Sequence, residues 1–287
     1  MDSIIFGDNQ FFGVNHMSED KAAQQALRFR TADDIYSVLK VVNNAGIKTF
    51  MFTTHDRLEP VLDRIKKDSA FQDFKLIPCM PYAHKYANAM VEAGMFGAIE
   101  KFLPNNKMLA GLRGLNSAIS ANPVPVMKLL IDSEMKWLSG HNVEAIFLQN
   151  IATDLVLGLG MDDLLGEFAT YVETQYGVRG GFITMNHKLL HDRLTRGVGL
   201  SSPLICSSIN KIGFRMNPSQ EAVEEVVQSG EGTTVAMSVL ASGAIRPAEG
   251  LQYIKELGGV SSVLFGASSS SHIREFKELA DDILGAT

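Results

Sequence analysis

The stretch TADDIYSVLKVVNNAGIKTFMFT, residues 31–53, contains the pattern that decides the fold. Thr31 followed by acidic residues is typical of a helix start, and Gly46 is typical of a helix end. Between them the apolar residues recur every three or four positions, at Ile35, Val38, Leu39 and Val42. The run Lys48–Thr53 is almost continuously apolar and predicts a strand buried on both faces. A helix that leads into such a strand is the repeating unit of a parallel α/β sheet.

The same alternation of apolar runs and amphipathic stretches continues along the chain. Eight strands are predicted, at Ser3–Phe6, Lys48–Thr53, Lys75–Met80, Glu144–Gln149, Gly181–Met185, Leu204–Ser208, Thr234–Ser238 and Ser262–Phe265. Further helices are predicted at Leu58–Asp68, Met161–Tyr176, Lys188–Arg196, Ser219–Ser229, Ala248–Leu257 and Ser271–Leu284. Strands that are each followed by a helical pattern favour a closed barrel over an open sheet. We therefore expect an α/β fold, a (β/α)8 TIM barrel, formed by residues 1–287 as a single domain.

The connection after the third predicted strand is much longer than the others. It contains about 60 residues, whereas a strand-to-strand crossover needs about 20 to 30. Helical patterns lie within it at Lys85–Phe102 and Val124–Leu138. We expect a helical insertion at 82–142 on the carboxyl-end face of the barrel, where barrel enzymes place their sites. A lid over the mouth and a helical elaboration packed on the outside both agree with this pattern.

The composition excludes several classes of protein. The 287 residues are 46% hydrophobic and carry a net charge of −6, so nucleic acid is not an expected partner. No run approaches the ~18 apolar residues of a membrane span, and the start MDSIIFGDNQ lacks the features of a secretory signal. The two cysteines, Cys79 and Cys206, indicate neither a disulfide framework nor a zinc motif. We expect a cytoplasmic protein with a small-molecule substrate, whose oligomeric state stays open.

Histidines are frequent among the polar residues that follow the predicted strands. Four of the seven histidines fall in these positions: His16, His55, His84 and His187. Histidines with an adjacent acid could bind zinc or another divalent metal, but the sequence contains no H-x-H or HExxH motif. The other interpretation is that they form hydrogen bonds with backbone or solvent, and that one of them is an acid or base. We assign no metal ligand and keep a metal as an open alternative.

Three charged residues after the strands are further candidates. Lys211 follows the sixth predicted strand, and because burial lowers the pKa of a lysine, a buried Lys211 could form a Schiff base. A phosphate contact, with Arg215 nearby, or a solvated charge are the alternatives. Asp8 and Asp56 follow the first two strands and are candidates for proton transfer, unless they only cap helices.

The segment VLFGASSSSHI, residues 263–273, places a glycine and a run of serines between the last strand and the last helix. Backbone N–H groups at a helix start, surrounded by hydroxyls, suit a phosphate. Barrel enzymes often hold a phosphate at the loops after strands seven and eight. The candidate contacts are Gly266, Ser268, Ser269, Ser270 and His272, and Arg274 could add charge. A serine-rich helix cap without a ligand is the alternative.

Four segments resemble the aldo/keto reductase superfamily. Two of them are AMSVLASG (236–243), which is similar to the strand-seven segment of that superfamily, and VLFGASS (263–269), which is similar to its strand-eight segment. In the superfamily, the strand-eight segment binds the adenosine phosphate of NADP. GFITMNHKLL (181–190) and GIKTFMFTT (46–54) are similar to its strand-five segment and its strand-two entry. The resemblance implies an NADP site that comprises Asn186, which matches an asparagine that holds the nicotinamide amide, Ser238, and the candidate phosphate contacts named above.

The catalytic tetrad of that superfamily is not preserved. Its Asp and Tyr positions fall at Met51 or Phe52 and at Asp56 or Arg57, its Lys at Met80 and its His at Gln149. The usual proton donor is therefore missing. Tyr82 and His84 are the candidates to replace it, because a Tyr beside a cation can donate a proton to a forming alkoxide.

Three functions compete. The resemblance favours a divergent aldo/keto-reductase-like oxidoreductase that acts on a small carbonyl or hydroxyl substrate with NADP(H). Its candidate catalytic residues are Tyr82, His84, His55, Asp56, Gln149 and Lys211. The alternative is a nicotinamide-free lyase, isomerase or hydrolase, with or without a metal, that acts on a small anionic substrate at the same barrel mouth. A non-catalytic barrel that binds a ligand is the third, and the polar mouth argues weakly against it.

Overall fold

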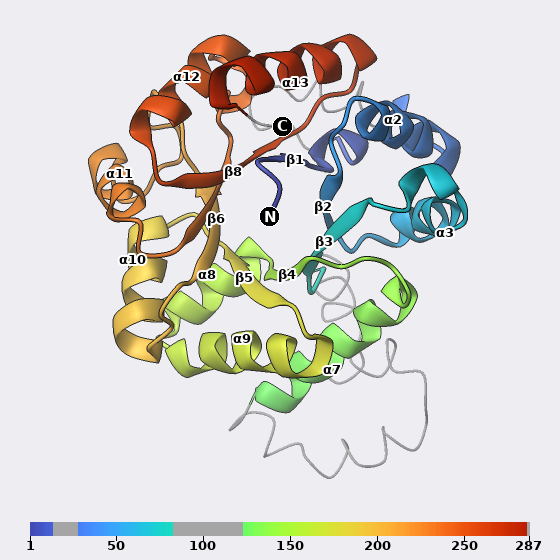
Figure 1. Ribbon diagram of the computed structural model, residues 1–287. Helices are drawn as coiled ribbons and strands as arrows, with labels where there is room; N and C mark the ends of the chain where they lie inside the picture. Colours follow the sequence, from blue (N-terminus) through green and yellow to red (C-terminus); the bar gives the residue numbers. More distant parts are fainter. Residues whose placement is uncertain (14–27, 83–122, 286–287) are drawn as a thin grey trace, which may run out of the picture.

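The strands form a closed barrel, as Figure 1 shows. The computed structural model describes residues 1–13, 28–82 and 123–285. Within them, eight parallel strands pair in sequence order, and the last pairs back onto the first. The strands are β1 (Ile4–Phe6), β2 (Thr49–Thr53), β3 (Lys75–Met80), β4 (Ala145–Leu148), β5 (Arg179–Ile183), β6 (Leu204–Ser208), β7 (Thr233–Met237) and β8 (Val260–Phe265). The predicted (β/α)8 TIM barrel is confirmed, and each predicted strand lies within two residues of the observed one.

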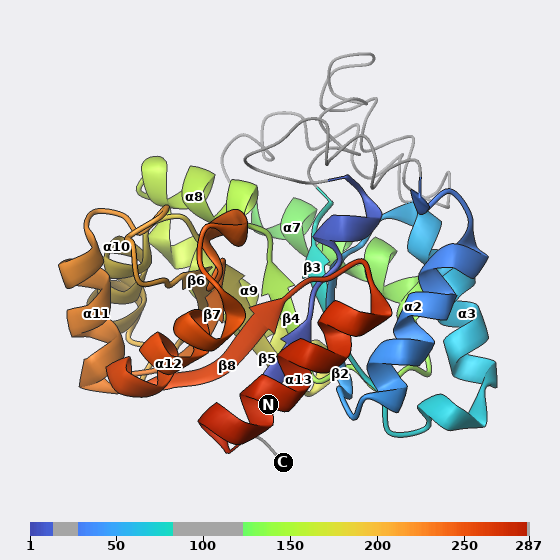
Figure 2. The same ribbon diagram turned by 90° about the horizontal axis from the view of Figure 1, so that it is seen from above.

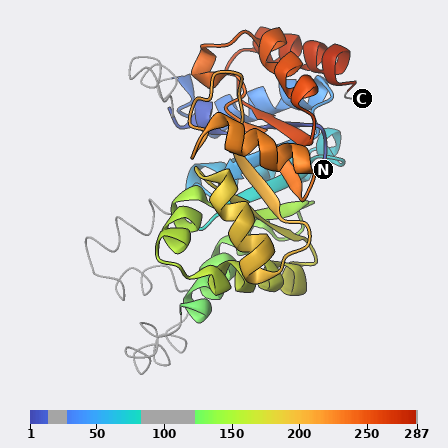
Figure 3. The same ribbon diagram turned by 90° about the vertical axis from the view of Figure 1, so that its left-hand side faces the viewer.

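Helices lie around the outside of the strands (Figures 1 and 3). They are α2 (Ala32–Asn44), α3 (Glu59–Lys67), α7 (Val124–Met135), α8 (Asn150–Gly158), α9 (Asp162–Tyr176), α10 (His187–Asp192), α11 (Gln220–Ser229), α12 (Pro247–Leu257) and α13 (Ser270–Leu284). A π-helical turn, η5 (Arg193–Val198), continues α10. Short 3-10 turns are η1 (Asn9–Phe11), η2 (Asp56–Leu58), η3 (Ser69–Phe71), η4 (Lys136–Leu138) and η6 (Ala241–Gly243). The pair α2 and α3 lies on the opposite side of the barrel from α10 to α12 (Figures 1 and 2). Among the described helices, none has the length and apolar character needed to cross a bilayer.

The ends of the helices follow the signals in the sequence. Thr31 and Asp34 form a reciprocal cap at the start of α2: the Asp34 N–H donates to Thr31 Oγ1 at 3.2 Å, and the Thr31 N–H donates to the Asp34 carboxylate at 2.8 Å. Gly177 ends α9 with a φ of 68°, a left-handed conformation that costs glycine little. Ser219 and Ser269 cap α11 and α13 through their hydroxyls. These caps fix where the loops around the barrel begin.

Alternate strand residues point inward and fill the barrel. The interior cluster of buried residues consists of Ile5, Met51, Ile77, Cys79, Ala145, Phe147, Leu204, Cys206 and Val235. The ring of Phe147 packs over Gly181, where an added Cβ would lie 2.7 Å from the ring. Gly181 therefore makes room for this ring on the neighbouring strand. The middle of the barrel is a packed core, which leaves the carboxyl ends of the strands as the place for a site.

The remaining strand residues face the helices and form a second, larger core. Phe50 and Phe52 of β2 are fully buried there, with ring centroids 5.0 Å apart. Burial of each such side chain stabilises the fold by about 2 to 3 kcal/mol. The strands are thus held from both sides, so the polar groups at their carboxyl ends have fixed positions.

Two features differ from the sequence-based expectation. Helix α8 is not indicated by the sequence pattern, because Ile151 and Leu155 are 46% and 60% exposed and its apolar residues therefore do not mark one buried face. Strand β5 begins two residues earlier than predicted. Asn186 and His187 lie beyond the strand, as predicted, and form the start of α10.

The predicted insertion at 82–142 is described only at its end. The predicted helix Val124–Leu138 is present as α7 followed by η4. Asp132 in α7 accepts hydrogen bonds from the hydroxyls of Tyr171 and Tyr176 in α9, each at 2.5 Å, which ties α7 to the barrel. The predicted helix Lys85–Phe102 lies outside the described residues, and the lid stays a prediction.

Candidate functional site

The carboxyl ends of β1 and β2 hold a buried acid at the mouth of the barrel. Asp8 stands two residues after β1 and is only 8% exposed. Its Oδ2 accepts a hydrogen bond of 2.7 Å from the N–H of Thr53, the last residue of β2. Burial raises the pKa of Asp8 to about 6, although hydrogen bonds involving Thr53 act in the opposite direction. The charge of Asp8 also acts on Cys79, whose pKa is raised first by burial and then by Asp8.

His55 lies between two aromatic rings beside this acid. Its ring stacks on Phe12 at a centroid distance of 4.5 Å and lies 5.1 Å from the ring of Tyr82. The N–H of Arg57 donates to His55 Nδ1 at 3.1 Å, so the neutral ring carries its proton on Nε2. Burial raises the pKa of Tyr82, and the charges of Asp56 and Asp8 raise it further. Tyr82 therefore holds its proton firmly near neutral pH.

A buried glutamate connects the loops after β2 and β3 to α7. Glu134 Oε1 accepts a hydrogen bond of 3.0 Å from the N–H of Tyr82, and Oε2 accepts one from the hydroxyl of Thr54. The Thr54 hydroxyl also contacts the carbonyl of Cys79 at 3.3 Å. Sequence reasoning missed Glu134, because a glutamate in an amphipathic helix normally faces solvent. Helix α7, at the end of the predicted insertion, thus fixes the backbone of Tyr82 at the mouth.

The opposite half of the mouth carries hydroxyl groups. Ser208 at the end of β6 donates through Oγ to Ser238 Oγ at 3.3 Å. Ser238 has a φ of 56°, and Ala241 and Ser242 in the same loop have φ values of 45° and 58°. Residues other than glycine adopt this left-handed conformation at a cost of about 1 kcal/mol or more each, so the surrounding structure must hold the loop in place.

Asn186 stands at the start of α10, next to this half of the mouth. Its Oδ1 accepts from the N–H of Leu189 at 3.2 Å and so caps the helix. Its side-chain nitrogen makes no hydrogen bond with another described residue. Asp154 in α8 holds the chain just before it, since its carboxylate accepts from the Thr184 hydroxyl at 2.6 Å and from the Met185 N–H at 3.0 Å. The amide of Asn186 is therefore fixed through one atom only.

The loop between β8 and α13 is a close-packed turn with serine hydroxyls around a helix start. A Cβ added to Gly266 would lie 2.3 Å from Gln10 Oε1, so any larger residue there would require the end of the Gln10 side chain to move. That oxygen of Gln10 is buried and has no hydrogen-bond partner among the described residues, while Nε2 donates to the Gly7 carbonyl at 2.7 Å. Ser269 Oγ accepts from the N–H of His272 at 3.3 Å. The other predicted contacts flank this cap: Ser268 is half-buried, and Ser270 and His272 are exposed.

Of the four histidines that follow predicted strands, the structure places His187 away from the mouth. His187 is 2% exposed, and its Nδ1 is 2.8 Å from the hydroxyl of Ser207, a residue of β6 whose neighbours in the strand, Cys206 and Ser208, point into the barrel or to its mouth. Since side chains alternate along a strand, Ser207 and His187 lie on the helix-facing side of β6. Burial lowers the pKa of His187 to about 4, so the ring is neutral at pH 7. His16 and His84 lie outside the described residues.

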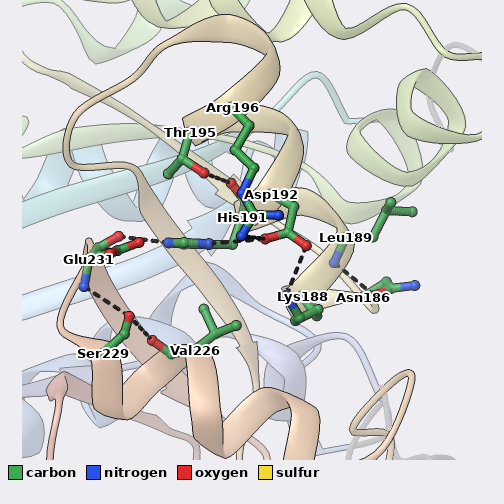
Figure 4. A network of polar contacts seen from close by, with 10 residues as sticks. All are labelled: Asn186, Lys188, Leu189, His191, Asp192, Thr195, Arg196, Val226, Ser229 and Glu231. Atoms are coloured by element: carbon green, nitrogen blue, oxygen red, sulfur yellow. Dashed lines mark hydrogen bonds and ion pairs between the residues drawn. The ribbon is translucent and has the colours of Figure 1, made fainter.

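A polar network anchors α10 next to His187. His191 stacks on the ring of His187 at 6.5 Å, and its Nε2 is 2.8 Å from the carbonyl of Glu231 (Figure 4). Lys188 and Asp192 form an ion pair of 2.9 Å on the same helix. These contacts join α10 to the turn before β7, well away from the groups at the mouth.

The remaining predicted catalytic residues take different places. Lys211 is 52% exposed and pairs with Glu249 at 2.7 Å, which raises its pKa, so the burial that a Schiff base requires is not present. Asp56 is exposed at the start of η2, and Gln149 is buried at the end of β4, where its N–H donates to the Met80 carbonyl at 3.0 Å. In the described part of the chain, no three His, Cys, Asp or Glu side chains are placed to hold a metal ion.

Apolar side chains occupy two positions that match the superfamily's tetrad. Met51 is buried inside the barrel, and Met80 is buried on the helix-facing side of β3. Neither can transfer a proton. Any proton donor at this mouth must therefore come from other positions.

Comparison with known proteins agrees with this architecture. No protein-family model matches the chain, and no curated protein matches its sequence. Solved structures match over 98% of the chain. One is a Pseudomonas aeruginosa protein described as an aldo-keto reductase, with a TM-score of 0.59, 12% identity and 90% of its own length covered. Another is a thermostable aldo-keto reductase in complex with the inhibitor epalrestat, with a TM-score of 0.58, 13% identity and the same coverage of its length. The resemblance seen in the sequence is thus confirmed for the fold, and this chain has the barrel fold of the aldo-keto reductases.

Proposed function

We propose that this protein is a divergent aldo-keto-reductase-like oxidoreductase that acts on a small carbonyl or hydroxyl compound with NADP(H). The observation that carries the proposal is the loop between β8 and α13, where Gly266 packs against Gln10 and Ser269 caps the helix. Structural neighbours with the same barrel are aldo-keto reductases, which favours the same general chemistry. Fold alone does not fix an activity, so the residues of the site must support it.

The residues of this loop fit the adenosine phosphate of NADP. The start of α13 favours an anion through its dipole, and Ser268–Ser270 place hydroxyls around it. Arg274 is exposed in the same part of the helix and has no ion pair with another described residue. Gly266 keeps the approach free of a side chain.

The other end of the cofactor would lie at the hydroxyl-bearing half of the mouth. Asn186 has a side-chain nitrogen that can donate to the carboxamide of nicotinamide, and Ser238 stands nearby on the strained loop after β7. NADPH, when bound, supplies the hydride. The groups that would hold the substrate and move a proton then lie opposite, in the half that contains Asp8, His55 and Tyr82.

The same geometry bears on the other predicted catalytic residues. Asp56 and Gln149 stay candidates at the mouth, where they could bind the substrate, and His84 stays a candidate from outside the described residues. Lys211 fits a surface role better, because its charge is paired with Glu249 in solvent. The substrate must be small and enter from the mouth, since the interior below is filled by side chains such as Phe147 and Cys206.

Titration of the protein with NADPH, followed by reduced-nicotinamide fluorescence, tests this proposal. We expect saturable enhancement, displacement by NADP, and weaker binding of NADH. Arg274→Glu should weaken NADPH binding about tenfold, because a lost charge-assisted contact to phosphate costs about 1.5 kcal/mol. Lys277→Gln is the matched control, since Lys277 lies one turn further along α13 and pairs with Asp281. An unchanged fluorescence and melting temperature in micromolar NADPH would contradict the proposal.

One observation keeps the second candidate function in view. Asp8 has a pKa of about 6, and such a carboxyl can take up or release a proton in a reaction that needs no nicotinamide. If NADPH does not bind, a lyase, isomerase or hydrolase acting on a small anionic substrate becomes the better proposal. Phosphate-containing compounds would then be the first probes, because the loop at α13 still suits an anion.

A further inference from the structure

The loss of the superfamily's tetrad leaves open which group moves the proton. Two ionisable side chains of the described mouth stand close enough to influence each other, Asp8 after β1 and Tyr82 after β3. We propose that Asp8 is the catalytic acid and base of this site, and that it gives its proton to the substrate oxygen on reduction and takes it back on oxidation. This inference rests on the proposed oxidoreductase function.

The position of Asp8 suits this task. It follows β1 directly, at the end of the barrel where the strands of such enzymes present their catalytic groups. Its carboxyl is oriented by its neighbours: Oδ2 accepts from the Thr53 N–H at 2.7 Å, and the Thr53 side chain and the backbone N–H of Asp8 itself also donate to the carboxyl. The backbone N–H fixes the orientation of the group and stabilises the carboxylate that remains after proton transfer.

Among the described residues, no charged neighbour contributes to the pKa shift of Asp8, and His55 lies in the same half of the mouth. The titratable groups that its charge affects are the thiol of Cys79 on β3 and the phenol of Tyr82, and neither carries a positive charge. Burial, and not a neighbouring charge, raises the pKa of Asp8. It comes to about 6, within reach of neutral pH, whereas the pKa of Tyr82 is moved further away from neutrality. A general acid works best when its pKa is near the working pH, which favours Asp8 over Tyr82.

The proton and the electrons balance in this assignment. On reduction, the O–H bond of the protonated Asp8 carboxyl breaks and a new O–H bond forms on the carbonyl oxygen, while the carbonyl carbon receives a hydride. NADPH is the reductant and leaves as NADP⁺, and the carbonyl compound becomes an alcohol. Asp8 is left as a carboxylate and regains its proton from solvent before the next turnover. On oxidation each of these changes runs in reverse.

The protonation of Asp8 can be measured without any activity. The full-length protein labelled with ¹³C at the aspartate carboxyl carbons is titrated by NMR, and Asp8→Asn identifies the signal. We expect a carboxyl signal that titrates near pH 6 in the unmodified protein and is absent from the variant. An Asp8 signal that titrates near pH 4 would overturn the proposal, whatever the protein does with NADPH.

Kinetics then separate this proposal from the proposed function. With 4-nitrobenzaldehyde as the probe, Asp8→Asn should bind NADPH within about threefold of the unmodified protein but transfer hydride about 100-fold more slowly. The Tyr82→Phe variant should lose less, and Asp8→Glu should recover part of the rate. The rate of reduction should fall as the pH rises through about 6, because the acid must be protonated, and this dependence should persist in Tyr82→Phe.

The possible failures differ in kind. If the unmodified protein does not bind NADPH, the proposed function is wrong, and the NMR titration still decides the protonation of Asp8. If NADPH binds and Asp8→Asn transfers hydride at the normal rate, the function stands and Asp8 is not the acid. If Tyr82→Phe abolishes the pH dependence, Tyr82 takes the role assigned here to Asp8.

Discussion

Asp8 and His187 are both buried, and both are shifted toward their neutral forms, yet they lie on opposite faces of the barrel wall. Burial raises the pKa of Asp8 to about 6 and lowers that of His187 to about 4. Asp8 stands at the mouth with one carboxylate oxygen bonded by Thr53. His187 stands behind β6, bonded to Ser207 and stacked on His191. A shifted pKa therefore indicates burial. Whether a buried group can contact a substrate depends on its position, at the mouth of the barrel or on the helix-facing side of the strands.

His187→Ala should have the largest effect on stability, a loss of about 4 kcal/mol in the free energy of unfolding. The substitution leaves a cavity behind β6 and a buried hydroxyl of Ser207 without its partner. Chemical denaturation measures the loss, with the exposed His272→Ala as the control. A variant that stays stable but no longer binds NADPH would show that His187 belongs to the site, and the contrast drawn here between His187 and Asp8 would be wrong.

Asp8→Asn should stabilise the protein increasingly as the pH rises from 4 to 7. The pKa of Asp8 is higher in the folded state, so the folded state binds more protons in this range and loses stability as Asp8 ionises. A shift of about two pKa units corresponds to about 3 kcal/mol, a gain for the variant that is absent below pH 4 and complete above about pH 6. Paired denaturation curves at pH 4.5 and 7.5 check it. An equal stability difference at both pH values would show that Asp8 is not buried as an acid.

Glu134→Gln should cost about 2 kcal/mol and loosen the Asp8 side of the mouth. One of the two oxygens becomes an NH₂ group, which then faces either the Tyr82 N–H or the Thr54 hydroxyl. Hydrogen exchange of the Tyr82 amide should become faster, while exchange within α10 stays unchanged. Glu167→Gln on α9 is the control, because Glu167 forms only an exposed ion pair with Lys128. Unchanged exchange at Tyr82 would mean that this contact does not hold the loop.

Lys211→Gln should have the smallest effect, about 0.5 kcal/mol or less. The pair with Glu249 is exposed at the surface, and such pairs contribute little because solvent screens them. A double-mutant cycle with Glu249→Gln measures the pair directly. Borohydride trapping of a substrate adduct on Lys211 would contradict the surface role and restore the Schiff-base interpretation.

The fold could be predicted because buried parallel strands appear in the sequence as continuous apolar runs. Such runs identify the strands even when the predicted ends are wrong by one or two residues. The positions of the buried polar side chains around the mouth were harder to predict from the sequence. The sequence shows that His187 follows a strand, but not that it is the first residue of α10 and that its ring packs against Ser207 behind β6. Glu134 carries no signal in its own helix, since its partners Thr54 and Tyr82 are far away in sequence.

The protonation of Asp8 depends on the same long-range packing. A sequence shows that an aspartate follows a strand, but the degree of burial comes from segments that fold around it. The raised pKa of Asp8, which separates it from Asp56 as a proton donor, could therefore be found only in the folded structure.

The pairing of β1 with β8 has a consequence for the synthesis of the protein. The hydroxyl of Ser262 donates to the carbonyl of Asp2, 260 residues earlier in the chain, and the Gly7 N–H donates to the Phe265 carbonyl at 2.8 Å. A ribosome makes β1 long before β8, so this edge of β1 stays unpaired while the residues between the two strands are produced. Contacts over such separations also form slowly. The mouth around Asp8 is therefore completed only after β8 has been made, and a nascent chain must keep β1 from pairing elsewhere until β8 arrives.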